Sequence, residues 1–437
     1  MNDLYVQGRR ITNVSPPVTY GLLVLGWVLL FGFALSVAAL GGVAPDVRAF
    51  QVAYGVGFVG YGLLIGVLAR SRECTKIGRW RWWFCGCVAL RLLLAGTEPT
   101  DDAFRYVWEG RVQQAGYNPY RHAPDDPVLA PLRDDSWSQI NHPHVPAIYP
   151  PLAQMEFLAA VTVYPSLYVV KGFHVVWDIC VVAVLAACLR RKSKRPQWAA
   201  VYALCPLVLS AFAVEGHLDS LMLLLVVATA WAIMAGRLKS AGVLLGLAIA
   251  AKTVPVVLLP WLAWRHRRSA MIAVATVALC YSPYLINGPV GLSNLWRFGE
   301  GGVFLSLLAL APASVVDTAI ARYALASVLA LTSLVLAWRR RDFVQYAAEM
   351  TAALVLLLPI VHYWYLTWIL LFQPFQPRIR WLVAALLMVV YFEASRRAIV
   401  YGEWAMPRWA PVAIWAPFCC VWLIEAMNRR RGTLEAR

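Results

Sequence analysis

Charged side chains are scarce in this sequence. They make up 14% of its 437 residues, whereas hydrophobic residues make up 61%. Apolar runs long enough to cross a membrane recur from Thr19 almost to the C-terminus, and a soluble domain cannot bury that many. The runs also lack the alternation of apolar and polar residues that a transmembrane β-barrel requires. We therefore expect an all-α polytopic membrane protein.

Three further features are missing. No internal repeat is recognisable, which argues against the hypothesis that the protein is a transporter built from symmetric halves. The polar segment 97–150 has no cysteine, and most of the nine cysteines lie in apolar runs, so we interpret them as small core residues rather than disulfides or metal ligands. No small-residue cleavage site follows the first long apolar run, so we expect that run to be retained.

The net charge of +16 has a pattern of its own. Lys and Arg gather in short runs between apolar segments, at 70–81, 190–195, 265–268, 339–341 and 429–431. This is the positive-inside pattern of a membrane protein, so we expect no nucleic-acid partner. With the basic runs inside, both termini are cytoplasmic and the acidic segment 97–150 lies outside.

Charge and run length together predict about 12 full spans and one re-entrant hairpin. The hairpin, at 240–264, would be two half-helices broken near Lys252 and Pro255, which keeps the basic run 265–268 inside. The chain, 1–437, would form a single integral membrane domain. Its outer side would carry a first loop at 97–166, with an interfacial or re-entrant segment at 151–165, and a second loop at 288–317.

Acidic residues gather in the first outer loop. Within 97–126 they are Glu98, Asp101, Asp102, Glu109, Asp125 and Asp126. A helix starting after Pro99 explains some of them, because Thr100 can cap it and acids favour the first turn. That helix also places Asp102, Arg105, Tyr106 and Glu109 on one face. A carboxylate beside arginine and aromatic rings suits a general base near sugar and phosphate, so helix cap and catalytic site both stay open.

Other polar residues of the outer side also stand out. Asn118, Tyr120, His142 and Tyr149 lie in turn-rich aromatic loops, and His142 with His144 lacks a third zinc ligand, so we expect no metal site. His217 and Asp219 lie where two spans meet. Lys171, His174 and Asp178 share one helical face, which favours a structural Lys–Asp pair over catalysis.

Several residues could instead hold a phosphate. Lys252, at the hairpin tip, either binds phosphate as a point charge or reaches the interface as a snorkelling lysine. His362 lies between two outer helix ends with Tyr363 and Tyr365, whose rings also suit an aromatic belt. Arg396 and Arg397 break the positive-inside trend, and they could grip a lipid-carrier phosphate or contact membrane lipid head groups.

Several of these residues form ordered motifs. In chain order they are Asp101-Asp102-x-x-Arg105-Tyr106-x-Trp108-Glu109-Gly110, Asn118-Pro119-Tyr120, Tyr149-Pro150-Pro151-Leu152-Ala153-Gln154, Gly216-His217-x-Asp219, Ala251-Lys252-x-x-Pro255 and His362-x-Trp364-Tyr365. Together they resemble the GT-C superfamily of integral membrane glycosyltransferases over residues 80–375. The likeness is closest to bacterial polyprenyl-phosphate-mannose-dependent mannosyltransferases and more distant to the first mannosyltransferase of GPI-anchor assembly.

The resemblance implies a GT-C bundle in the bacterial inner membrane, with its active site facing the periplasm. The donor would be a sugar, above all mannose, on a polyprenyl phosphate, and the acceptor a hydroxyl of a lipid or glycan. An acid of the first outer loop, Asp101 or Asp102, would be the base of an inverting single displacement. No cofactor is implied, although acids and a phosphate donor are compatible with a divalent cation. In a departure from many members, two spans rather than one precede the span leading into this loop.

The resemblance and the polar clusters assign the remaining residues. Those expected to bind substrate are Arg105, Tyr106, Glu109, Asn118, Tyr120, His142, Tyr149, His217 and Asp219. Those expected to bind the donor phosphate are Lys252, His362, Tyr363, Tyr365, Arg396 and Arg397. The alternative, a transporter or flippase of lipid-linked glycans, predicts polar residues spread through the spans, whereas here they concentrate at one outer loop.

Overall fold

The fold is built from helices. The computed structural model describes residues 16–70, 80–100, 102–285, 294, 303–311 and 319–434, so Asp101 and most of the second outer loop expected at 288–317 lie outside it. Within these ranges the only extended pairings are isolated bridges, such as Gly42 with Glu98. The prediction of an all-α protein is therefore confirmed.

Five of the described helices are long and apolar enough to cross a membrane. They are α1 (Pro16–Leu40), α2 (Val47–Arg70), α7 (Leu167–Arg191), α16 (Ala319–Arg339) and α21 (Ala410–Leu434). A sixth candidate is a bent pair, Pro196–Ala203 and Pro206–Val214, whose halves meet at 64°. The prediction of about 12 full spans is not confirmed.

The remaining apolar helices are shorter than the roughly 20 residues that a full span needs. They include α6 (Pro151–Val163), α10 (Asp219–Met234), α11 (Leu238–Ala251) and α17 (Phe343–Leu357). The rest of the bundle consists of short pieces, among them α4 (Trp80–Ala95), α5 (Asp102–Gln114), α18 (Leu366–Leu370), α19 (Ile379–Leu387) and α20 (Phe392–Tyr401). The apolar runs of the sequence look continuous by hydropathy, but in the structure turns divide them into short helices.

The segment expected as a hairpin breaks at Lys252 and Thr253, after α11. A 3₁₀ turn (Val254–Leu258), α12 (Leu259–Arg265) and α13 (Arg267–Leu285) follow. Gly242 lies against Ser269 and Gly246 against Ala273, so α11 and α13 run in the same direction. The chain between them must therefore return to the end where α11 began, which places the basic run 265–268 near Lys239.

A buried ion pair ties α4 to α7. The Arg91 Nε donates to Asp178 Oδ2 at 2.7 Å, and Tyr202 donates to the other carboxylate oxygen at 2.7 Å. The expected pairing of Asp178 with Lys171 is wrong, since the Lys171 ammonium donates to Thr97 instead. A spacing on one helix could not reveal a stronger partner that comes from another helix.

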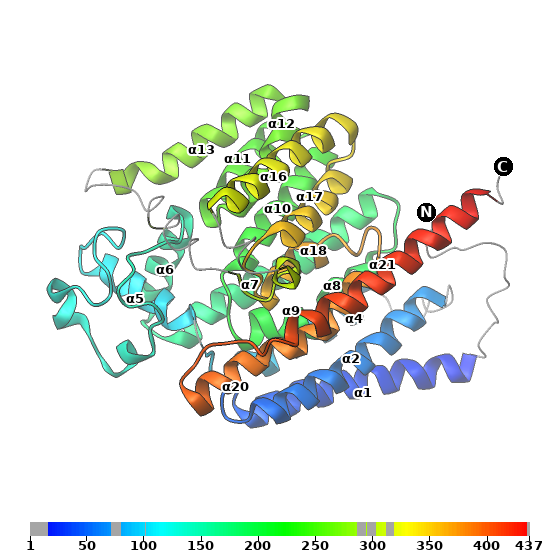
Figure 1. Cartoon of the computed structure of the whole chain (residues 1–437), viewed down its shortest axis with the longest axis horizontal. Coiled ribbons are helices and arrows are strands. Elements are labelled where there is room, and N and C mark those ends of the chain that lie inside the picture. The colour runs from blue at the N-terminus through cyan, green and yellow to red at the C-terminus, as the bar shows by residue number, and fades with distance from the viewer. Residues whose placement is uncertain are drawn as a thin grey trace.

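The outer-loop helices gather at one end of the bundle. Figure 1 shows α5 and α6 at this end, while α1 begins and α21 ends on the opposite side. The two helices touch at Gly110, where an added Cβ would lie 2.6 Å from the Phe157 carbonyl oxygen. This close approach lets residues on both helices share one polar network.

Gly110→Ala should therefore destabilise the protein by about 1–3 kcal/mol, because a methyl group there overpacks against backbone. Thermal unfolding of the purified protein in detergent measures the effect. Gly172→Ala in α7 is the matched control, since its Cβ would meet nothing within 4 Å. An unfolding midpoint in Gly110→Ala equal to that of the control would contradict the close packing of α5 on α6.

Candidate active site

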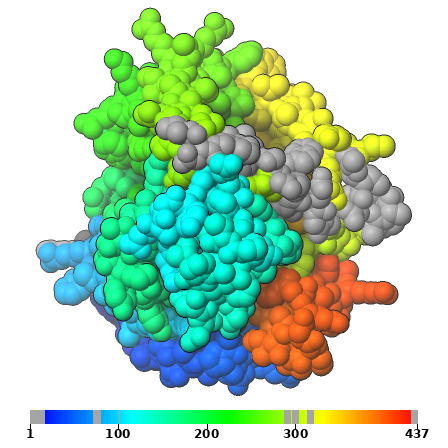
Figure 2. All heavy atoms as spheres, turned by 90° about the vertical axis from the view of Figure 1, so that its left-hand side faces the viewer, coloured from blue at the N-terminus to red at the C-terminus, as the bar shows by residue number. Residues whose placement is uncertain are grey.

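A cavity of about 1160 Å³ opens at the end of the bundle that carries α5 and α6. Its walls come from α5 and the residues before it, the loop 135–150, the break at 252–254, the segment 358–368, and α20 with Trp404. Figure 2 looks onto this end, where the outer loop (cyan) lies beside the α20 region (orange). Segments far apart in the sequence therefore meet around one space.

The structure brings some of the predicted site residues to this cavity and places others away from it. Those that line it are Asp102, Arg105, His142, Tyr149, Lys252, His362 and Tyr365. Those that do not are Tyr106, Glu109, Asn118, Tyr120, His217, Asp219, Tyr363, Arg396 and Arg397.

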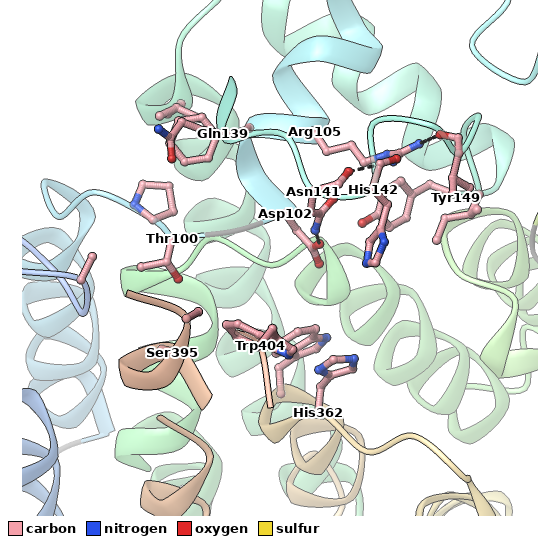
Figure 3. A pocket seen from close by; sticks show the side chains of 18 of the residues that line it. Thr100, Asp102, Arg105, Gln139, Asn141, His142, Tyr149, His362, Ser395 and Trp404 are labelled. Carbon is pink, nitrogen blue, oxygen red and sulfur yellow. Dashed lines mark hydrogen bonds between the residues drawn. The ribbon is translucent and has the colours of Figure 1, made fainter. Parts of the chain in front are cut away.

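Asp102 is the first residue of α5 and faces the cavity (Figure 3). Its Oδ1 accepts a hydrogen bond of 2.9 Å from the Asn141 amide, while Oδ2 lies 3.4 Å from the Tyr106 hydroxyl and 3.6 Å from the His217 Nδ1. Burial alone would raise the pKa of Asp102, but contact with His217 and the Asn141 amide lowers it below its ordinary value. Asp102 is therefore a carboxylate at neutral pH and can accept a proton.

The start of α5 is held from outside the loop. Thr100, expected as the helix cap, donates to Glu215 Oε2 through its amide at 2.9 Å and its hydroxyl at 2.6 Å. A π turn (Ser210–Val214) precedes this acid, and Gly216 follows with a φ of +65° that favours glycine. The same turn delivers His217 to Asp102.

Three rings stack along one wall. His217 lies on Trp364 at 3.7 Å between ring centroids, and Trp364 lies on His362 at 4.4 Å. The His362 Nδ1 is 2.9 Å from the Tyr391 hydroxyl. Burial lowers the pKa of His362 to about 4; the Asp102 charge opposes the shift, whereas His217 and Lys252 add to it. His362 is therefore neutral at pH 7 when no ligand is bound.

Lys252 supplies a positive charge to the cavity wall. Its ammonium lies 2.7 Å from both carboxylate oxygens of Asp219, and Trp368 donates to the same carboxylate at 2.6 Å. The ammonium also lies 5.2 Å from the Tyr365 ring centroid. Asp219 is 1% exposed, whereas the Lys252 side chain is 17% exposed and lines the cavity. Asp219 is thus the buried counter-ion of Lys252. The Lys252 ammonium, which lines the cavity, suits an anionic ligand.

Arg105 and Glu109 form a second buried pair. The Arg105 Nε donates to Glu109 Oε1 at 2.8 Å, and its terminal nitrogens donate to backbone carbonyls of the loop 141–145. Burial raises the pKa of Glu109, and the Arg105 charge opposes that shift. Glu109 lies behind the wall, where it holds Arg105.

The other predicted residues shape the loop or the core. Asn118 accepts from the Tyr120 amide at 2.9 Å, and the Tyr120 hydroxyl donates to the Tyr149 carbonyl at 2.7 Å. The Tyr106 ring stacks on Phe157 at 4.7 Å, and Tyr363 is buried in the main core.

The two outer arginines pair locally. Arg396 donates to Glu393 at 2.5 Å, and Arg397 lies 3.6 Å from Glu403. The cavity is instead lined by Ser395, Ala398 and Ile399 of the same helix.

Sequence reasoning missed several lining residues. Asn141 directly precedes His142, the residue that stands out in this loop by sequence. Trp364 belongs to the motif His362-x-Trp364-Tyr365, but only the residues around it are assigned a role by sequence. Gln139, Ser395 and Trp404 carry no sequence signal, since only the fold brings them to the cavity. Across the described ranges, no three His, Cys, Asp or Glu side chains converge as metal ligands; Asp101 is outside those ranges.

The fold is that of a helical membrane protein, and one end of the bundle opens into a cavity lined by charged and aromatic side chains. Residues 15–268 match the family described as alpha-(1->6)-mannopyranosyltransferase, N-terminal domain. The match covers more than half of the chain, so this protein belongs to that mannosyltransferase family, of GT-C type. The comparisons with curated proteins and with solved structures gave no match. The matched region contains Asp102 and Lys252 but ends before His362.

Asp219→Ala should destabilise the protein strongly, by about 3 kcal/mol, because it leaves Lys252 without its carboxylate. The double variant Asp219→Asn/Lys252→Met removes both charges at similar volume and should lose much less. Thermal unfolding of the three proteins in detergent makes the comparison. A double variant that is no more stable than Asp219→Ala would show that the pair is not the source of the loss.

Proposed function

We propose that this protein transfers mannose from a polyprenyl-phosphate donor to a hydroxyl of a lipid-linked or glycan acceptor. Membership of a mannosyltransferase family supports the glycosyltransferase class. The observation that carries the rest is one cavity that holds an ionised carboxylate, Asp102, together with Lys252 and His362. Asp102 can take a proton, and Lys252 and His362 can bind the leaving phosphate.

Asp102 is the proposed base. The acceptor oxygen attacks the anomeric carbon as its proton passes to the Asp102 carboxylate. The bond from that carbon to the phosphate oxygen breaks on the opposite face, with an oxocarbenium-like transition state, so the configuration inverts. Of the two adjacent acids, Asp102 is the one with a described place at the cavity.

Lys252 and His362 are the proposed groups on the donor phosphate. Lys252 offers a point charge that Asp219 holds at the wall. His362 is fixed by Trp364 and Tyr391, so it can present a ring nitrogen without a large reorganisation. Arg105 is less suited to this role, because its donors already serve Glu109 and the loop.

The cavity is proposed to face the periplasm of the bacterial inner membrane, with both termini cytoplasmic. Pro45, just before α2, lines the cavity, and α2 ends at Arg70. Leu167, at the start of α7, also lines it, and that helix ends at Arg190 and Arg191. Both helices thus carry their basic ends roughly 36 Å from the cavity end. By the positive-inside rule, these basic ends support a cavity that faces outside.

Asp102→Asn should lower the rate of mannose transfer about 10²- to 10⁴-fold, because the amide cannot accept the acceptor proton. The assay follows mannose from polyprenyl-phosphate-mannose in membranes. The pKa of Asp102 is lowered, so its carboxylate stays ionised at about pH 4, the ordinary pKa of an aspartate. Protonation of Asp102 should therefore cause no loss of rate in the unaltered protein at that pH. Asp125→Asn, in the same loop, is the control, and Asp101→Asn is tested in parallel. Full activity in both the Asp101 and Asp102 variants would disprove a catalytic acid here.

A cysteine placed at Ser136, an exposed residue at the cavity rim, tests the orientation. Ser136→Cys should react with a membrane-impermeant maleimide added to intact cells from which the outer membrane has been removed. The unaltered protein gives the background from native cysteines. Labelling only after the inner membrane is broken would place the cavity in the cytoplasm.

A further inference from the structure

We propose that Arg105 and Asn141 are positioning residues for the catalytic carboxylate. Arg105 clamps the loop 141–145, and Asn141, held in that loop, sets the orientation of Asp102. The inference rests on the proposed function, in which Asp102 is the base. The sequence predicted that Arg105 and Glu109 bind substrate. In this proposal they instead support the base.

The guanidinium of Arg105 makes four hydrogen bonds to the protein, one of them to Glu109. Its Nη1 donates to the carbonyl oxygens of Asn141 at 3.2 Å and His142 at 3.1 Å, and its Nη2 donates to that of Val145 at 2.5 Å. Figure 3 shows the side chain reaching this loop. A planar guanidinium can serve several carbonyls and a carboxylate at once, whereas an ammonium is a compact point donor. The residue therefore acts as a clamp.

The clamp is anchored from behind. Glu109 accepts from Arg105 through Oε1 and from the Gln154 amide through Oε2, at 2.5 Å. The Gln113 side-chain amide also donates to the backbone carbonyl oxygen of Gln154, at 2.9 Å. Since Gln154 belongs to α6, the close contact of that helix with α5 at Gly110 fixes the whole network.

The clamped loop adopts a conformation that it would not prefer alone. His142 has a φ of +47°, in the left-handed region that is uncommon for residues other than glycine. Such a residue persists where the surroundings determine the backbone. Here Arg105 holds the carbonyl oxygens of both His142 and its neighbour Asn141. The turn presents the Asn141 side chain to Asp102.

Asn141 then fixes one oxygen of the base. Its amide donates to Asp102 Oδ1 at 2.9 Å, as Figure 3 shows, while Oδ2 lies near Tyr106 and His217. A carboxylate can accept about four hydrogen bonds, so Asp102 keeps capacity for an acceptor hydroxyl. A small rotation of this group would misalign it, and a misplacement of about 1 Å can cost about 10²-fold in rate.

The test compares Asn141→Ala, Asn141→Asp and Arg105→Lys in steady-state kinetics across pH with polyprenyl-phosphate-mannose. Asn141→Ala should lower kcat about 10- to 100-fold with the donor KM nearly unchanged. The acid limb of the pH profile should move to higher pH, because the lost amide lowered the pKa of Asp102. Asn141→Asp keeps the side-chain shape and should move the limb further, since like charges disfavour ionisation. Arg105→Lys should lower kcat in the same way.

The readouts separate positioning from other roles. The titratable groups that interact with Asp102 are unchanged in the Asn141 variants, so a shifted limb in Asn141→Ala reports the lost amide; these groups are Tyr106, Glu109, His142, His217, His362 and Tyr365. Ser138→Ala, in the same loop but off the cavity, is the control, and thermal unfolding checks that each variant folds.

Three outcomes overturn the proposal. An unchanged kcat and acid limb in both Asn141 variants, with Asp102→Asn inactive, would refute positioning while leaving the base intact. A raised donor KM with unchanged kcat in Arg105→Lys would show that Arg105 holds the donor phosphate. An active Asp102→Asn would instead remove the proposed base itself.

Discussion

Charges buried in an apolar bundle need partners, and this constraint organises the protein. An uncompensated buried charge costs several kcal/mol, so each ionised side chain needs a partner within the protein. Arg91 meets Asp178 inside the bundle, Arg105 meets Glu109 beneath the outer loop, and Lys252 meets Asp219 at the break after α11. Asp102 accepts a hydrogen bond from the Asn141 amide, lies 3.6 Å from the His217 imidazole and faces the cavity.

The same constraint sorts side chains into those that can meet a ligand and those that support them. Asp219 and Glu109 are hidden and serve as counter-ions, whereas their partners reach the cavity wall. The stack of His217, Trp364 and His362 joins the carboxylate region to the proposed phosphate region without an ion pair. Base and phosphate-binding groups can therefore lie in one cavity without neutralising each other. A transporter would need polar groups along a path, and this cavity lies at one end of the bundle.

Sequence patterns predicted the helical class and the break at Lys252, because hydropathy and proline act locally. The catalytic role of the acidic stretch stays a prediction. The predicted count of about 12 full spans is not confirmed, since turns between short helices leave the hydropathy of a run unchanged. Sequence patterns also misjudged partners. The face shared by Asp102, Arg105 and Glu109 was real, but whether Arg105 serves a ligand or the loop depends on carbonyls that lie 36–40 residues away. Arg396 and Arg397 stood out by topology, yet nearby acids engage them.

The central claim is that an acceptor hydroxyl meets Asp102 while the donor phosphate meets Lys252 and His362 in one cavity. A cryo-electron microscopy structure with a non-transferable polyprenyl-phosphonate mannose analogue and an acceptor sugar tests it most directly. The account predicts an acceptor hydroxyl within hydrogen-bond distance of Asp102, on the face of the mannose opposite the phosphonate, with the phosphonate against Lys252 and His362. A phosphonate held by Arg105 or Arg396, or an acceptor hydroxyl bound away from Asp102, would contradict it.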